Sequence, residues 1–297
     1  MQLALTLVGP EPGAVAEALA AVGPALAGAG ARVKEPRPLG PGALDMAVEA
    51  EDAAAVRTAA EGALAGRPVD VCVQPWSGRR KRLLVADMDS TIINVECLDE
   101  LADFAGLKAE ISAITERAMR GELEFEAALR ERVGMLKGLP VAVLEQAHAE
   151  RVRLNPGART LVRTMAAAGA RCVLVSGGFS FFAARVAAAA GFHAERANTL
   201  HAADGALTGR VGEPILGREA KLAALQEEAA DLRLPLAATL AVGDGANDLG
   251  MIEAAGLGVA YRAKPIVAAR ADARVDHADL TALLHFQGYG RAEFVSD

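Results

Sequence analysis

The chain has 297 residues, of which 52% are hydrophobic and 23% charged, and its formal net charge is −7. At about 150 residues per domain, this length predicts two domains or one domain with a large insertion, and the composition excludes a disordered or fibrous protein. The apolar runs are much shorter than the ~20 residues that a membrane span needs. We therefore expect a soluble protein with no membrane partner, and the acidic charge argues against a nucleic-acid partner.

The start of the chain and its cysteines indicate the compartment. Residues 1–10 carry no basic residue ahead of their apolar run, unlike a signal peptide. The three cysteines, Cys72, Cys97 and Cys172, are odd in number and form no C-x-x-C pattern. We expect them to be small core residues in a reducing compartment, not a disulfide or metal framework. These features predict a cytoplasmic location.

Residues 1–78 alternate between β-capable and helical patterns, and Gly and Pro in 9–13 break the first apolar run. The expected order is strand, helix, two strands, helix and strand, over residues 2–8, 14–27, 32–35, 43–49, 52–65 and 69–74. This βαββαβ order is typical of the ferredoxin-like fold, and the region resembles ACT-type regulatory domains. We expect an ACT-like domain over 1–78 and a solvated basic linker over 79–82.

The second domain is predicted over residues 83–297. Three apolar runs, 83–86, 172–175 and 239–242, each end at a polar, Gly-containing loop followed by a helical pattern. This alternation indicates a parallel sheet covered on both faces. Because ligands of such sheets bind beyond the carboxyl ends of the strands, we expect the functional residues in these three loops.

An insertion separates the first two of these strands. About 85 residues lie between them, whereas a crossover needs only a dozen or more. The apolar spacing over the insertion is helical, so we expect a helical cap at about 95–155, ended by Asn155-Pro156-Gly157. Further along, Asp204-Gly205 between two short strand-like pieces predicts a hairpin turn.

Acidic residues follow the first and third runs. Asp87 and Asp89 lie in the loop after the first, where the alternative is that one of them caps a helix. Asp244 and Asp248, after the third, would share a helix face, an unfavourable pair unless a cation compensates; the alternative here is a turn with a helix cap. If the loops meet, their carboxylates form the oxygen-rich site that suits Mg²⁺.

Two further features could bind phosphate. Ser176-Gly177-Gly178 opens an expected helix over 179–190, and glycines at a helix N-terminus allow backbone N–H groups to approach a phosphate closely. Lys221 lies at the start of another expected helix, over 218–230; taken alone, it would be interpreted as a solvated surface residue.

In chain order these segments read D-M-D-S-T, S-G-G, Lys221 and G-D-G-A-N-D. The set resembles the haloacid-dehalogenase-like (HAD) superfamily of phosphohydrolases, over residues 83 to about 285. The resemblance implies an α/β, Rossmann-like core, with Asp87 as nucleophile and Asp89 as general acid and base. It implies Mg²⁺ bound by the Asp87 and Asp244 side chains and the Asp89 backbone carbonyl. Phosphate binding and metal orientation are implied for Ser176, Gly177, Lys221, Asn247 and Asp248.

Two stretches, D-M-D-S-T-I-I-N-V-E-C-L-D-E and F-E-A-A-L-R-E-R-V-G-M-L-K-G, narrow the resemblance to phosphoserine phosphatases. That family hydrolyses O-phospho-L-serine to L-serine and phosphate, the last step of serine biosynthesis. Glu96 matches the residue that binds the substrate ammonium and Arg132 the one that binds its carboxylate, a task suited to a bidentate guanidinium. Phe125, seven residues before Arg132, shares its helix face. Without the motifs, Glu96 and Arg132 would be interpreted as solvated helix charges.

Other functions stay open at this point. A HAD phosphatase for another small phosphorylated metabolite is one alternative, and an amino-acid-sensing protein with a silent catalytic half is another. ACT-type domains often pair through their sheets, which implies a homodimer. The loop 9–13 lacks the acidic residue that usually precedes the glycine turn, so binding of an effector such as L-serine stays open. None of the five histidines neighbours a proposed reactive residue, and there is no C-x5-R loop for a thiol nucleophile.

Overall fold

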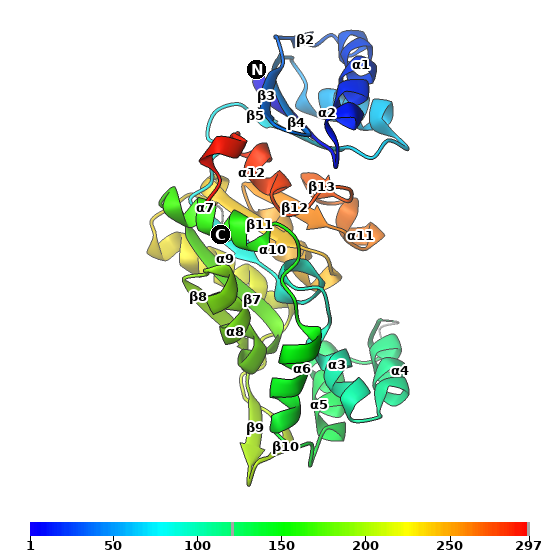
Figure 1. Cartoon of the computed structure of the whole chain (residues 1–297), viewed down its shortest axis with the longest axis vertical. Helices are drawn as coiled ribbons and strands as arrows, with labels where there is room; N and C mark the ends of the chain where they lie inside the picture. Colours follow the sequence, from blue (N-terminus) through cyan, green and yellow to red (C-terminus); the bar gives the residue numbers. More distant parts are fainter. Residues whose placement is uncertain (120–121, 296–297) are drawn as a thin grey trace.

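The structure is a computed structural model, and it describes residues 1–119 and 122–295. An antiparallel sheet with its helices lies at one end, a parallel sheet lies in the middle, and helices α3 to α6 lie at the other end (Figure 1). The strands are β1 (Gln2–Val8), β2 (Arg32–Val33), β3 (Arg37–Gly40), β4 (Ala43–Glu49), β5 (Asp70–Pro75), β6 (Leu83–Ala86), β7 (Arg171–Phe179), β8 (Ala194–Asn198), β9 (Leu200–Ala203), β10 (Ala206–Val211), β11 (Thr239–Gly243), β12 (Leu257–Tyr261) and β13 (Ala273–Val275). The longer helices are α1 (Pro12–Gly28), α2 (Ala53–Leu64), α3 (Cys97–Phe104), α4 (Lys108–Met119), α5 (Phe125–Met135), α6 (Ala142–Arg151), α7 (Ala158–Ala167), α8 (Ser180–Ala190), α9 (Arg218–Asp231), α10 (Leu249–Ala254), α11 (Pro265–Ala268) and α12 (Ala282–Phe286).

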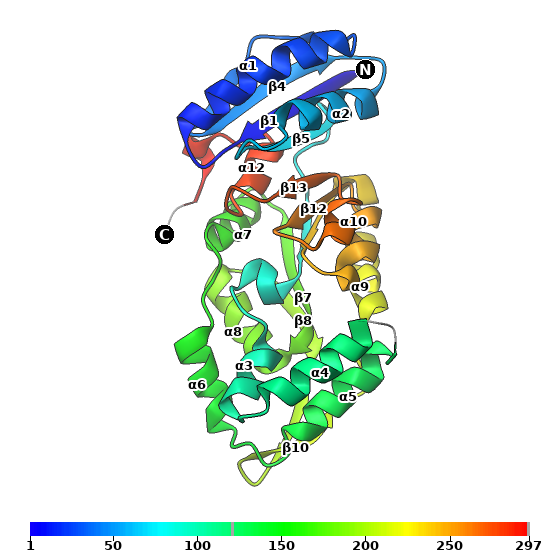
Figure 2. The same ribbon diagram turned by 90° about the vertical axis from the view of Figure 1, so that its right-hand side faces the viewer.

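The N-terminal sheet has the strand order β2-β4-β1-β5, with every neighbouring pair antiparallel. Leu3, Leu5 and Leu7 alternate along β1 and pack in one cluster with apolar residues of α1 and α2, as the two-residue period of a strand requires. The βαββαβ order is confirmed, with the additional strand β3 paired to β4. The expected strand over 32–35 is shorter, Arg32–Val33. The other face of this sheet lies toward α12 and β13 (Figure 2).

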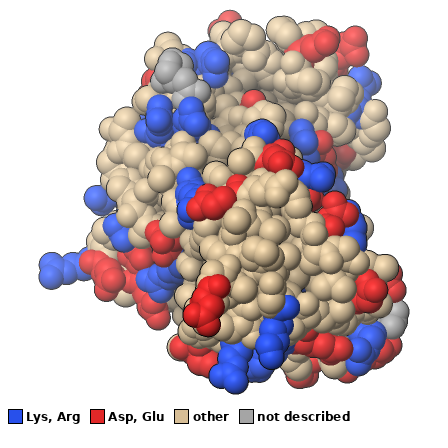
Figure 3. All heavy atoms as spheres, turned by 60° about the horizontal axis from the view of Figure 1, so that its bottom comes forward, with Lys and Arg blue, Asp and Glu red and all other residues tan. Residues whose placement is uncertain are grey.

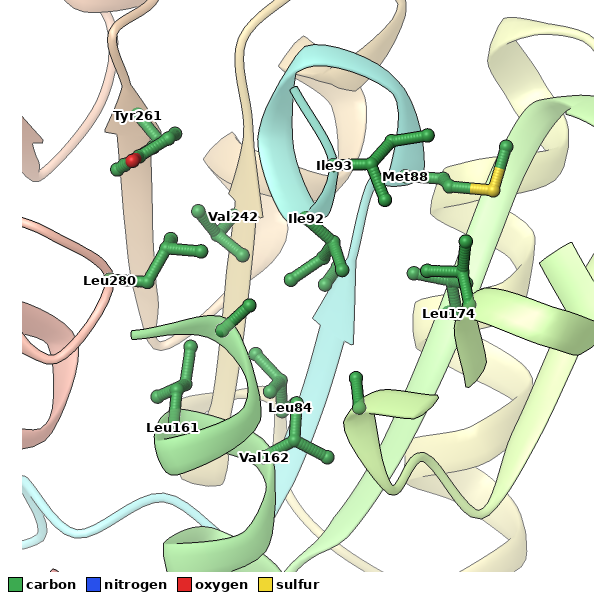
Figure 4. Packing of buried hydrophobic residues seen from close by; sticks show 14 of the residues in the cluster. Leu84, Met88, Ile92, Ile93, Leu161, Val162, Leu174, Val242, Tyr261 and Leu280 are labelled. Atoms are coloured by element: carbon green, nitrogen blue, oxygen red, sulfur yellow. The ribbon is translucent and has the colours of Figure 1, made fainter. Parts of the chain in front are cut away.

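The central sheet has the order β13-β12-β11-β6-β7-β8 and is parallel throughout. The three strands predicted here are confirmed. Leu84 of β6 and Val242 of β11 pack with Leu161 and Val162 of α7 on one face (Figure 4). The opposite face packs against α9. Because both faces are covered, the strands are apolar without alternation, and their carboxyl ends form a rigid edge for the loops that follow.

The segment between β6 and β7 contains α3, α4, α5 and α6, as expected of the cap, although residues 120 and 121 of that prediction lie outside the described residues. Its two connections to the core pair with each other: the Asn94 amide donates to the Arg153 carbonyl at 3.1 Å. Strands β9 and β10 form the predicted hairpin, with Asp204 and Gly205 at φ 50° and 77° in its turn. Strand β10 contacts α5 of the cap.

The basic segment 79–82 differs from the expected solvated linker. Arg79 and Lys81 are buried. Arg79 donates to both carboxylate oxygens of Asp45 on β4 at 2.8 Å, and the Lys81 ammonium donates to the carbonyls of Ala237 and Gly256. The prediction was wrong for these two side chains because their buried acceptors lie far away in the sequence.

No helix within the described residues is long and apolar enough to cross a bilayer. On the face drawn in Figure 3, acidic and basic side chains are interspersed. The three cysteines are free and buried, which confirms that they are core residues.

Candidate active site

Acidic side chains from two neighbouring strands meet at the carboxyl edge of the central sheet. Asp87 directly follows β6 and Asp244 directly follows β11, and the Asp87 amide donates to the Val242 carbonyl at 3.0 Å. One carboxylate oxygen each from Asp87, Asp244 and Asp248 lies within 4.8 Å of the other two. This acidic cluster could hold a metal ion. Its oxygen donors suit a hard cation.

The expectation that Asp244 and Asp248 share a helix face is wrong. Asp244 lies in the loop before a short turn, Ala246–Asp248. The two residues are instead joined by hydrogen bonds, because Asp248 Oδ2 accepts from the amides of Asp244 at 3.2 Å and Gly245 at 3.0 Å. A Cβ at Gly243 would lie 2.3 Å from the Asp248 Cγ, so only glycine fits there. Asp248 therefore fixes the loop that carries Asp244.

Lys221 on α9 reaches the cluster from the side. Its ammonium group contacts Asp87 Oδ1 and lies 2.6 Å from Asp248 Oδ1, and the side chain is only 2% exposed. Burial alone would lower the pKa of Lys221, but the charges of Asp248 and Asp87 outweigh it and raise that pKa above its ordinary value. Lys221 is therefore a permanent buried cation and not a solvated surface residue.

The cluster contains more negative charge than Lys221 can balance. Burial, followed by the charge of Asp248, raises the pKa of Asp87 well above its usual range. The same two causes raise the pKa of Asp244 to about 6. Three carboxylates beside one ammonium group leave a net negative site when all are ionised, and a bound divalent cation would compensate this charge.

Asp89 lies beside the cluster and faces the end of β7. Its Oδ1 accepts from the Cys97 amide at 3.1 Å, and its Oδ2 accepts from the Ser176 hydroxyl at 3.4 Å. Burial, followed by the charge of Glu96, raises the pKa of Asp89 to about 7. This carboxyl group can therefore gain and lose a proton near neutral pH, as general acid and base catalysis requires.

The segment Ser176–Gly178 continues β7 instead of opening the next helix, which begins at Ser180. The expected helix over 179–190 is confirmed to within one residue, and the S-G-G segment before it belongs to the sheet, with a register irregularity between Val175 and Phe179. The Gly178 amide donates to the Ser176 hydroxyl at 2.8 Å, and a Cβ at Gly178 would lie 2.8 Å from Asp89 Oδ2. A glycine is thus required where β7 passes Asp89.

Cap residues lie over this edge. A Cβ built at Gly177 would be 3.4 Å from the ring of Phe125, and one at Gly217 would be 3.3 Å from it, so Phe125 packs on the end of β7 and on the residue before α9. Glu96, just before α3, accepts a hydrogen bond from the Ser90 hydroxyl at 2.6 Å. The cap therefore contacts the loop after β6, the end of β7 and the segment just before α9.

Arg132, on α5, makes its hydrogen bonds within the cap. Its guanidinium donates to the Thr115 hydroxyl at 3.3 Å and to the Ala128 carbonyl at 3.2 Å. Burial lowers the pKa of Arg132, and the charges of Asp99 and Glu96 oppose that shift, so both acidic residues lie near enough to act on this cation. Asn247, in the short turn Ala246–Asp248 after β11, is half-buried, and its Oδ1 would lie 2.5 Å from a Cβ at Gly245.

Sequence reasoning missed three residues that position this site. Asn198 is buried, donates to the carbonyls of Gly177 and Leu216, and accepts from the Leu216 amide at 2.7 Å. Ser90 has a φ of 56°, unusual for a residue with a side chain, and Thr91 donates to Asp244 at 3.3 Å. Ser90 and Thr91 lie within the D-M-D-S-T segment, whereas nothing in the sequence around Asn198 indicates its role.

The fold and the acidic cluster define a class of hydrolase. The sequence profile of haloacid dehalogenase-like hydrolases matches residues 84–253, and the chain belongs to this family. Its relatives include phosphoserine phosphatases. One from Mycobacterium tuberculosis is 44% identical over 227 residues, which are 76% of this chain; the chain spans only 55% of that relative's length.

Solved structures agree with the family assignment. A structure described as a phospho-aspartyl intermediate analogue of phosphoserine phosphatase is 39% identical, with a TM-score of 0.65, over 70% of this chain and 99% of the other. A HAD family hydrolase from Salmonella enterica serovar Typhi is 29% identical, with a TM-score of 0.82, over 96% of this chain and 98% of the other. The second match therefore includes the N-terminal sheet.

Proposed function

We propose that the chain is a phosphoserine phosphatase, which hydrolyses O-phospho-L-serine to L-serine and phosphate through an aspartyl-phosphate on Asp87. The observation that carries this proposal is the position of Lys221, a buried cation shared by Asp87 and Asp248. A phosphate next to Asp87 would meet this fixed positive charge. Similarity to phosphoserine phosphatases, including the phospho-aspartyl analogue, supports the substrate and the intermediate.

In the first step, the Asp87 carboxylate attacks the phosphorus atom and the bond to the serine oxygen breaks. The protonated Asp89 carboxyl gives its proton to that oxygen, so L-serine leaves as a neutral hydroxyl. The pKa of Asp89, raised to about 7 by burial and then by Glu96, supports this role because a carboxyl with an ordinary pKa would seldom be protonated.

In the second step, the Asp89 carboxylate takes a proton from a water molecule as that water attacks the phosphorus atom. The bond between phosphorus and Asp87 breaks, which releases phosphate and restores the Asp87 carboxylate. Asp89 is then protonated again, ready for the next substrate. Splitting one hydrolysis into two displacements lowers the barrier that each step has to cross.

We propose Mg²⁺ as the cofactor, with the Asp87 and Asp244 side chains and the Asp89 backbone carbonyl as its protein ligands. Bound Mg²⁺ neutralises charge that would otherwise keep a dianionic phosphate away from a carboxylate nucleophile. The negative charge of the cluster and its all-oxygen donors fit such an ion. Asp248 orients the loop of Asp244 and the ammonium group of Lys221.

The phosphoryl oxygens would be bound by Lys221, the Ser176 hydroxyl and the Gly177 amide, with Asn247 at the edge of the site. Fixed donors of this kind stabilise the charge that develops in the transition state. Asn198 supports them, because its side chain links the Gly177 carbonyl to the Leu216 backbone just ahead of α9.

The cap would select the amino acid part of the substrate. Glu96 is proposed to bind the ammonium group and Arg132 the carboxylate, with Phe125 as an apolar wall above Gly177 and Gly217. The Ser90 hydroxyl fixes Glu96, and the Thr115 hydroxyl contacts Arg132. The charge of Glu96 acts on the pKa of Arg132, so the two side chains lie near each other. One negative and one positive side chain match the ammonium and carboxylate groups of the substrate.

One assay tests this function: phosphate release from O-phospho-L-serine, O-phospho-L-threonine and sugar phosphates, with Mg²⁺ and with excess chelator. We expect release from O-phospho-L-serine with Mg²⁺ and none with chelator. A clear preference for a sugar phosphate would favour the alternative, a HAD phosphatase for another small metabolite. Activity that persists in excess chelator would contradict the metal role. Activity on O-phospho-L-serine would place the chain at the last step of serine biosynthesis.

We further propose that residues 1–78 form an ACT-like regulatory domain, residues 79–82 link it to the catalytic domain 83–297, and the chain forms a homodimer. The order of the N-terminal elements, βαββαβ with the additional strand β3, supports the first point. Calorimetry with L-serine tests for an effector, and the mass in solution tests the dimer. A cytoplasmic location is consistent with three free, buried cysteines.

A further inference from the structure

We infer that Asp70, on the last strand of the N-terminal sheet, is a positioning residue for the cap. It fixes a core segment, residues 276–281, on which the cap hinge rests. The cap hinge is defined here as residues 91–94 and 152–157, the two connections between core and cap. The inference rests on the proposed function only where it concerns substrate affinity.

The first link is the carboxylate of Asp70, which is buried at 4% exposure. Its Oδ1 accepts from the amides of Asp276 at 2.9 Å and His277 at 3.2 Å, and its Oδ2 accepts from the amide of Ala278 at 2.8 Å. Three consecutive amides thus point at one carboxylate. Such charge-assisted bonds are stronger than bonds between neutral groups, so the N-terminal sheet fixes the backbone after β13.

The second link joins that backbone to the cap hinge. The Leu280 amide donates to the Pro156 carbonyl at 3.1 Å. A Cβ at Gly157, whose φ is 81°, would lie 2.7 Å from the Thr281 nitrogen and 2.9 Å from Asp279 Oδ1. Residues 279–281 therefore fit closely against Pro156 and Gly157, and Leu280 is fully buried. A shift of residues 276–278 would be transmitted to this contact.

The third link is Asn155, which joins the two halves of the cap hinge. Its amide donates to the Ile92 carbonyl at 2.8 Å, and its side-chain amide donates to the carbonyls of Thr91 and Ile93 at 2.8 and 3.0 Å. Thr91 itself donates to Asp244 in the acidic cluster. Asn155 therefore fixes the angle at which the cap leaves the core. The next residue, Pro156, contacts the segment 276–281 that Asp70 holds.

A loosened cap hinge should weaken substrate binding more than it slows the chemical steps. The residues proposed to react or to bind phosphate lie on the core, whereas Glu96, Phe125 and Arg132 lie on the cap. A loosened hinge would displace the cap residues and weaken their contacts equally in the ground state and the transition state. Loss of such uniform binding raises KM and leaves kcat nearly unchanged.

The test compares Asp70→Asn with Asp52→Asn in the full-length protein. Asparagine keeps one oxygen at position 70 but turns an NH₂ group toward an amide donor. Asp52 is the matched control, because it also accepts from a backbone amide of the N-terminal unit, that of Ala54 at 2.8 Å, but is exposed. The readouts are amide hydrogen exchange and steady-state kinetics with O-phospho-L-serine. Thermal unfolding verifies that both variants fold, and the graded variant Asp70→Ala extends the series.

We expect Asp70→Asn to raise KM by about fivefold with kcat changed by less than about twofold, and to speed exchange of the amides of residues 92–94, 153–155 and 157 by at least about threefold. Asp52→Asn should change neither. Faster exchange confined to residues 276–278, or a fall in kcat with KM unchanged, would overturn the inference. If the wild-type chain released no phosphate from O-phospho-L-serine, the proposed function would fail. The exchange data alone would then show whether Asp70 positions the cap hinge.

Discussion

Lys221 and Asp248 form a buried ion pair, with 2.6 Å between Nζ and Oδ1, and neither side chain is more than 2% exposed. The same ammonium group contacts Asp87, so one side chain from α9 joins the loops that follow β6 and β11. Removing either partner leaves a buried charge with reduced compensation, which is costly in a protein interior. Stability and activity are therefore coupled at this pair.

Replacement of Asp248 tests that coupling. Asp248→Asn should lower the free energy of unfolding by about 3 kcal/mol, because Lys221 loses one of its two carboxylates, and should also reduce kcat. Denaturant titration and phosphate release measure the two effects. The exposed Asp231, at the end of the same helix as Lys221, supplies the control Asp231→Asn. Equal stability of Asp248→Asn and the wild type would show that the pair contributes little.

Replacement of Asp87 tests the nucleophile. Asp87→Asn should abolish turnover and the burst of labelled enzyme formed from radioactive substrate, since an amide cannot form the acyl phosphate. The fold should be retained, as Asn is isosteric and Lys221 keeps Asp248 as a partner. Rapid-quench labelling checks the burst. A burst of normal size in this variant would remove Asp87 as the phosphorylated residue.

Binding of Mg²⁺ can be measured by its effect on the melting temperature, without an activity assay. Mg²⁺ should raise the melting temperature of the wild-type chain, because an ion that binds only the folded state stabilises it. In Asp244→Asn the Mg²⁺ concentration needed for half of that shift should rise by more than about tenfold. The control is Asp231→Asn, with scans in Mg²⁺ and in chelator. An unchanged Mg²⁺ requirement in Asp244→Asn would exclude this carboxylate as a ligand.

Arg132 should favour substrates that carry a carboxylate over those that lack one. Arg132→Lys should raise KM for O-phospho-L-serine by about tenfold or more, because an ammonium group cannot replace a bidentate guanidinium. KM for O-phosphoethanolamine, which lacks the carboxylate, should change little. Steady-state kinetics with both substrates gives the comparison. A parallel rise in both KM values would show that Arg132 supports the cap and does not bind the carboxylate.

Acid sensitivity is expected at His285, between the N-terminal sheet and the core. Burial lowers the pKa of His285 below 6.5, although the Tyr289 carbonyl and the charges of Asp279 and Asp45 oppose this and Arg291 adds to it. The unfolded chain then takes up a proton at higher pH than the folded chain. The stability contribution is present above about pH 6.5 and lost as pH falls toward the folded pKa, by up to about 1.4 kcal/mol per unit.

Denaturation at pH 8 and pH 5.5 measures this loss. It should be smaller in His285→Gln, which cannot be protonated, and unchanged in the control His201→Gln on the exposed hairpin. The same loss in both variants and in the wild type would assign the acid sensitivity to other groups.

Local patterns predicted much of the fold correctly, and the errors have identifiable causes. Apolar runs predicted β6 exactly to its ends at Leu83 and Ala86, and helical spacing predicted the cap. Strand β7 extends beyond the expected Val175 because the glycines of the S-G-G segment continue in the sheet. Arg79 was misjudged since its buried partner, Asp45, lies 34 residues away. Such partners are set by packing, which leaves no local signal.

The amino-acid sequence alone determined which residues we propose to carry chemistry, because motifs that combine carboxylates and glycines after strands with a lysine on a later helix depend on residue type and order. Only the tertiary structure decided how these groups interact. The sharing of Lys221 between Asp87 and Asp248, the support of Gly177 by Asn198 and the three amides on Asp70 all join residues that are distant in the chain. Burial and long-range hydrogen bonding depend on the whole fold, so no local stretch of sequence encodes them.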